Sequence, residues 1–119
     1  MLRIAARFAD QWDTFGVIPG AATEGVETDL AGQIAALDAA CVAIGRDPSS
    51  IRRSTWATSE ALRSTDAYLD FVRHHHRLGF TDFSTVRPAA SDTGVLRRVA
   101  TEVIPELRAG RLLDEPATG

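Results

Sequence analysis

The fold is decided by a strand-and-helix unit that begins with Gln11-Trp12-Asp13-Thr14-Phe15, where aromatic and β-branched residues predict a short strand. Residues 16–25 hold three glycines and one proline, which predicts a loop. From about Glu27 to Ile44, apolar residues recur at alternating spacings of four and three, so they share one face of a helix. These residues are Leu30, Ile34, Leu37, Cys41 and Ile44.

The same order of strand and helix is predicted twice more. Residues 51–58 and 80–86 are β-prone and form the second and third predicted strands. A helix that Ser64 or Thr65 caps runs between them to about Leu78, and the glycine after each helix is expected to end it. A last helix follows, capped by Ser91 or Asp92, and Pro105 is expected to kink or end it.

This alternation predicts an α/β fold with a parallel sheet and right-handed crossovers. Residues 2–9 are predicted to form the end of a helix that precedes the first strand. Each strand-and-helix unit takes about 30 residues, as in an eight-fold β/α barrel. We therefore predict the last three strand–helix units of a (β/α)8 TIM-type barrel, incomplete as an isolated chain, in residues 1–113. Residues 114–119 are expected to form a flexible tail.

Composition narrows the class of protein. The 119 residues are 45% hydrophobic and 24% charged, with a net charge of −3, so we expect a soluble domain that binds neither nucleic acid nor anionic lipid. No apolar run approaches the roughly 18 residues that a membrane span requires. One cysteine, Cys41, cannot form an intrachain disulfide, which favours a cytoplasmic location.

Four motifs together resemble a known family. The order is Arg7-Phe8-Ala9-Asp10-Gln11-Trp12, then Gly45-Arg46-Asp47-Pro48, then Leu78-Gly79-Phe80, and last Val103-Ile104-Pro105-Glu106-Leu107-Arg108. In order and spacing they resemble the C-terminal part of the bacterial luciferase-like monooxygenases, and the resemblance runs from about Leu2 to Arg108.

The resemblance implies a flavin- or deazaflavin-dependent oxidoreductase, with FMN or a deazaflavin as cofactor and a small organic substrate. In that family the turn that holds the cofactor phosphate, and most residues that face the flavin ring, would lie upstream of Met1. We therefore expect this chain alone to bind no cofactor and to be inactive. The alternative is a small non-catalytic α/β module that self-associates into a homo-oligomer.

Three residues are candidates for cofactor contacts, and no residue is a catalytic candidate. Asp13 and Thr14 lie toward the carboxyl end of the first predicted strand, where the active sites of barrels lie. Arg87 ends the third strand, and its guanidinium suits a phosphate or a carboxylate. The alternatives are a loop-ordering hydrogen bond for Asp13 and a surface salt bridge for Arg87. Trp12 is expected in the core.

No metal site is predicted, although His74, His75 and His76 are consecutive. Consecutive residues of a helix point about 100° apart, so three such imidazoles cannot converge on one ion. The triplet is interpreted as a partly exposed face that gains charge in mildly acidic solution. Cys41 lies on the apolar helix face and is expected to be a buried small hydrophobic residue rather than a nucleophile.

Overall fold

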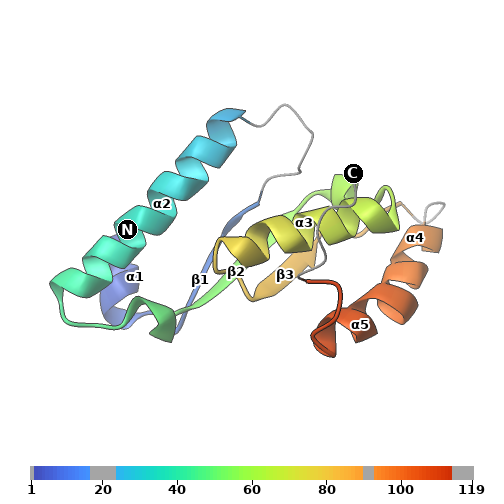
Figure 1. Cartoon of the computed structure of the whole chain (residues 1–119). Coiled ribbons are helices and arrows are strands. Elements are labelled where there is room, and N and C mark those ends of the chain that lie inside the picture. The colour runs from blue at the N-terminus through green and yellow to red at the C-terminus, as the bar shows by residue number, and fades with distance from the viewer. Residues whose placement is uncertain (1, 17–23, 90–92, 114–119) are drawn as a thin grey trace.

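The computed structural model describes residues 2–16, 24–89 and 93–113, which form an α/β fold (Figure 1). Its centre is a parallel sheet of three strands in the order β1-β2-β3. The predicted α/β class and parallel sheet are confirmed. The strands are β1 (Gln11–Phe15), β2 (Arg52–Ala57) and β3 (Asp82–Thr85).

Helices separate the strands, and local sequence signals set their ends. The Ser64 hydroxyl accepts a hydrogen bond of 3.0 Å from the Ala67 N–H, so Ser64 is the N-cap of α3. Gly45 and Gly79 have φ of 75° and 97°, which confirms that these glycines end α2 and α3. The helices are α1 (Leu2–Phe8), α2 (Glu24–Ala43), α3 (Thr65–Arg77), α4 (Thr93–Arg98) and α5 (Ile104–Arg108), with the short 3-10 helices η1 (Pro48–Ser50) and η2 (Ser59–Leu62).

One predicted boundary differs from the structure, and two predicted features lie outside it. Helix α2 begins at Glu24 rather than at about Glu27, because apolar spacing marks the buried face of a helix and not its first turn. The Ser91 or Asp92 cap and the tail 114–119 lie outside the described residues.

Pro105 reshapes the last helix, as predicted. A π-helical segment, η4 (Val99–Val103), stands between α4 and α5, and Pro105 lies in the first turn of α5. Proline has no N–H to donate and its ring clashes with the carbonyl four residues before it, so the ordinary helical register cannot continue through this point. The wider turn carries the chain past the proline.

One face of the sheet carries the helices. The Thr14 hydroxyl of β1 donates to Gln33 Oε1 of α2 at 2.9 Å, and the Arg53 guanidinium of β2 pairs with Asp38 of the same helix. On β3, the Phe83 ring meets the Phe71 ring of α3 edge-on, with 6.1 Å between centroids. Strand register aligns Thr14 with Thr55 and Thr55 with Phe83, so α2 and α3 cover the same face.

A first core cluster lies between α1, α2 and the start of β2. Cys41 is completely buried in it and Trp12 packs against it, which confirms both core predictions. Ile44 was predicted on the same face, and this is wrong because 55% of it is exposed. The helix ends at Ala43, and the Ile44 N–H bonds the Cys41 carbonyl in a turn, so the helical periodicity no longer places its side chain.

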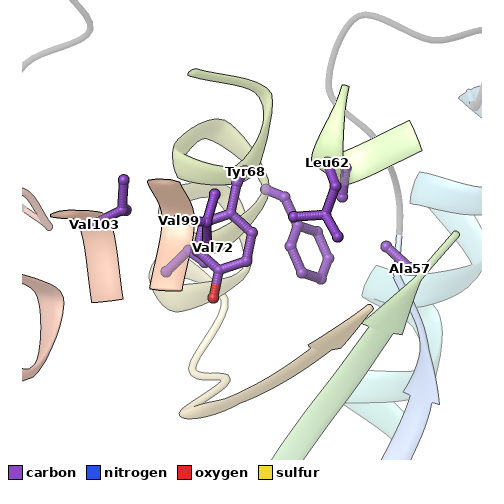
Figure 2. Close-up of a cluster of buried hydrophobic side chains, with 8 residues drawn as sticks. Ala57, Leu62, Tyr68, Val72, Val99 and Val103 are labelled. Atoms are coloured by element: carbon purple, nitrogen blue, oxygen red, sulfur yellow. The ribbon is translucent and has the colours of Figure 1, made fainter. Parts of the chain in front are cut away.

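A second core cluster joins α3 to the C-terminal helices (Figure 2). Val99 and Val103 of the π-helical segment meet Tyr68 and Val72 of α3, with Leu62 and Ala57 toward the sheet. Burial raises the pKa of the Tyr68 phenol, and the positive charge of Arg108 opposes that rise in part.

The histidine triplet is not one exposed face, so that interpretation is wrong for its middle member. His75 is completely buried, and its Nδ1 lies 2.8 Å from the Phe71 carbonyl oxygen. It stands four residues after Phe71 and therefore on the sheet-facing side of α3, where its ring also contacts Phe80. His76 is exposed and His74 is half-buried. No group of metal-ligating side chains occurs among the described residues.

Substituting Gly16 by alanine is expected to destabilise the fold. A Cβ at this position would lie 2.6 Å from Thr55 Oγ1, 2.9 Å from Phe71 Cε1 and 3.0 Å from His75 Nε2. Overpacking of this kind costs about 1–3 kcal/mol of unfolding free energy, measurable by denaturant unfolding. The matched control is Gly32→Ala in α2, where no atom lies within 4 Å; it is expected to stabilise the chain by about 0.5–1 kcal/mol. Equal effects of the two substitutions would contradict the packing around Gly16.

The raised pKa of Tyr68 predicts a loss of stability in alkaline solution. Because the folded state prefers the neutral phenol, the contribution of Tyr68 is fully present below its unfolded pKa of about 10 and is lost as the pH rises through the folded pKa. Tyr68 is the single tyrosine of the chain, so absorbance of the tyrosinate reports it alone. We expect its titration midpoint to fall when the chain is unfolded in guanidinium; an unchanged midpoint would show that the phenol is hydrated in the folded chain.

Candidate functional site

The second face of the sheet is the candidate site, and we call it the open face. Side chains alternate along a strand, so the residues of β2 that lie between the helix-facing ones belong to this second face. Phe15 and Trp56 on it remain 42% and 38% exposed. The open face consists of Gln11, Asp13, Phe15, Arg52, Ser54, Trp56, Asp82 and Ser84.

A chain of hydrogen bonds crosses the open face from β1 to β2. Gln11 Nε2 donates to Ser54 Oγ at 3.0 Å, and Ser54 Oγ donates to Asp13 Oδ1 at 2.6 Å. Ser54 is 6% exposed, so its hydroxyl is held between two β1 side chains. At the amino end of the sheet, Arg52 forms an ion pair with Asp82 and joins β2 to β3 in the same way.

This arrangement of hydrogen bonds indicates a structural role for Ser54 rather than the role of a catalytic nucleophile. A serine nucleophile requires a base, most often histidine, within hydrogen-bond reach. Ser54 instead donates to a carboxylate, and the histidines of the chain all lie on α3, which covers the opposite face. The hydrogen bonds therefore align β1 with β2 and keep the polar half of the open face in one arrangement.

The carboxyl end of the open face is aromatic. Phe15 and Trp56 are aligned by strand register and meet edge to face, with 4.7 Å between ring centroids and 84° between planes. Exposed aromatic area of this kind can receive a flat apolar group. A groove of about 600 Å³ lies past the ends of β2 and β3. Its lining includes Arg98 and the ion pair of Arg63 with Glu60.

The three predicted contact residues do not converge. Asp13 lies on the open face with Ser54, whereas Thr14 points to the helices and bonds Gln33. Arg87 follows β3 and is exposed. The structure thus brings Asp13 to Ser54 of the neighbouring strand rather than to the other two candidates, and a cofactor contact by any of the three stays a prediction.

Sequence reasoning missed Ser54 and Trp56. Alternation along β1 places Asp13 and Phe15 on one face, and alternation along β2 does the same for Ser54 and Trp56. The register that sets Asp13 opposite Ser54 comes from the pairing of β1 with β2, which a long segment separates in the sequence. No local sequence pattern predicts that register.

Comparisons of this chain with models of known families, with curated proteins and with solved structures found no match. The class that the structure itself defines is a parallel α/β sheet whose strands follow chain order, with helices on one face. Among the described helices, none combines the length and the apolar character needed to cross a membrane.

The coupling between Asp13 and Ser54 is testable by a double-mutant cycle. Asp13→Ala and Ser54→Ala each remove one end of the same hydrogen bond, so their effects on unfolding free energy should not add. We expect a coupling of about 1 kcal/mol, because the bond is charge-assisted but Asp13 is exposed. Asp13→Asn, which retains an acceptor oxygen, is the control and should cost less than Asp13→Ala. Additive effects would show that the two side chains do not interact.

Proposed function

We propose that this chain is the C-terminal part of a luciferase-like, flavin- or deazaflavin-dependent oxidoreductase of the cytoplasm. It would contribute three strands and their helices to a (β/α)8 barrel. The observation that carries the proposal is the combination of consecutive strand order with helices on a single face of the sheet.

That combination is what a segment of a β/α barrel requires. In a barrel each strand pairs with the next along the chain, the helices form the outer layer, and the other face points inward. A doubly wound sheet instead reverses its strand order and carries helices on both faces. Here β1, β2 and β3 follow chain order, and both α2 and α3 contact the face of Thr14, Thr55 and Phe83.

The open face and the two outer strands also support the proposal. Parallel sheets are almost always covered on both faces, yet Phe15 and Trp56 are substantially exposed on this one. Strands β1 and β3 each pair with one neighbour in the described sheet, and unpaired parallel edges need a partner. Further barrel strands would satisfy both requirements.

The described residues fit a flavin only in part. A bound FMN or deazaflavin would supply the redox chemistry, transferring electrons or hydride to oxygen or to a small organic substrate. This chain offers the aromatic surface of Phe15 and Trp56 at the carboxyl end of the sheet. It also offers Arg98 in the groove past β2 and β3, where Arg63 is paired with Glu60. The aromatic pair and the arginine-lined groove share no lining residue, so the described residues supply only parts of such a site.

A second candidate function is a non-catalytic module that forms a homo-oligomer. The observation in its favour is the group of exposed apolar side chains on α1 and the end of α2, where Ile4, Phe8 and Val42 are 65%, 73% and 67% exposed. Association of copies would bury them together with the strand edges. A cooperative melt and a discrete oligomer in size-exclusion chromatography with light scattering would favour this candidate over the barrel part.

The coding DNA upstream of Met1 provides the most direct test. An open frame of about 600 bases, encoding five further strand–helix units, would support the proposal, since a complete barrel takes about 250 residues. An in-frame stop codon close to Met1 would overturn it and favour the homo-oligomeric module.

Flavin titration of the isolated chain gives a further prediction. Because the described residues supply only parts of a flavin site, we expect no quenching of FMN or deazaflavin fluorescence at micromolar concentrations of the chain. A Trp56→Ala variant serves as the control, since any weak stacking on the aromatic pair would be lost with it. Micromolar flavin binding by the chain alone would contradict the proposal that further strands are needed to complete the site.

A further inference from the structure

A groove separate from the open face lies between α3, the start of β3 and α5. Its volume is about 410 Å³, within the range of small-molecule sites. Tyr68 and His76 line it from α3, Thr81 from the residue before β3, and Arg108 from α5. We call it the α3–α5 groove, and we propose that it binds a small carboxylate with an apolar body.

The floor of the α3–α5 groove is apolar and firmly held. Val72 is 2% exposed and belongs to the second core cluster, and Phe83 packs edge-on against the buried Phe71. Ile104 and Leu107 of α5 are half-buried against the same cluster. An aliphatic or aromatic ligand body placed here would exchange water for side chains that the fold already keeps in place.

The polar groups at the groove recognise an anion. Arg108 carries a permanent charge, and its planar fork matches the two oxygens of a carboxylate. None of the described residues that line the groove is acidic. Glu106, the acidic residue of α5, is held by Arg111, and within the described residues no ion pair engages Arg108.

The Tyr68 hydroxyl adds a directional hydrogen-bond donor to the charge of Arg108. Its side chain lies between α3 and the C-terminal helices (Figure 2) and is 9% exposed. Tyr68 from α3 and Arg108 from α5 both line the groove, and the positive charge of Arg108 lowers the pKa of the phenol. A neutral phenol donates one hydrogen bond, so a carboxylate can accept from Tyr68 and Arg108 together while its apolar body lies on Val72 and Phe83.

The location separates this site from the proposed oxidoreductase site. The α3–α5 groove is on the helix-covered side of the sheet and near the amino end of β3, where Thr81 stands. The aromatic pair Phe15 and Trp56 is on the open face and at the carboxyl end. Occupation of one site therefore does not depend on the other.

The test uses octanoate as the probe and 1-octanol as its uncharged counterpart. Binding of each is measured from the amide chemical shifts of the isotope-labelled 119-residue chain. We expect octanoate to bind with shifts concentrated at Tyr68, Thr81 and Leu107, and to bind at least about tenfold more tightly than 1-octanol. Arg108→Gln is expected to weaken octanoate binding about tenfold and to leave 1-octanol binding unchanged.

Two further variants distinguish a loss of carboxylate recognition from a loss of folding. Arg97→Gln removes an exposed arginine of α4 that does not line the groove, and it should bind octanoate like the unaltered chain. Tyr68→Phe removes one hydroxyl while keeping the ring, and it should weaken octanoate binding several-fold. The proposal is overturned if Arg108→Gln and Arg97→Gln bind octanoate equally, if the shifts lie elsewhere, or if the spectrum of the chain lacks the dispersion of a packed α3–β3–α5 layer.

Discussion

The rest of the structure depends on the pairing of β2 with a strand on each side. Its covered face carries Arg53, which pairs with Asp38 of α2, and Ala57, which belongs to the cluster around α3. Its other face carries Ser54, which binds two side chains of β1. Helix α2 contacts β1 and β2, and α3 packs against β3 and the end of β2. Strand β2 therefore connects the N-terminal and C-terminal core clusters.

The one-sided cover of the sheet links the fold to both functional candidates. A parallel sheet gains stability when apolar cover excludes water from both faces, and here only the helix side has such cover among the described residues. Further barrel strands or a second copy of the chain would each cover the open face. The α3–α5 groove lies on the covered side and depends on neither, since residues of α3, β3 and α5 already line it.

Features with a local cause could be predicted from the sequence, and features with a distant cause could not. The Ser64 cap, the left-handed Gly45 and Gly79 and the break near Pro105 follow from side-chain and backbone geometry within a few residues. The pairing of Asp13 with Ser54 joins residues 41 positions apart, and the α3–α5 groove joins three elements. The triplet His74–His76 shows both sides: its spacing excluded a shared ion, but only packing showed that the middle imidazole is completely buried.

By itself the sequence determined the α/β class, the order of elements and most of their ends, because periodicity, caps and turn residues act over one or two helical turns. Tertiary structure alone decided which face of the sheet the helices cover, which side chains meet across β1 and β2, and where a groove with an arginine and a buried phenol forms. These properties depend on strand register and on helices packing across long stretches of chain, and the free energy of such contacts resides in no single segment of the sequence.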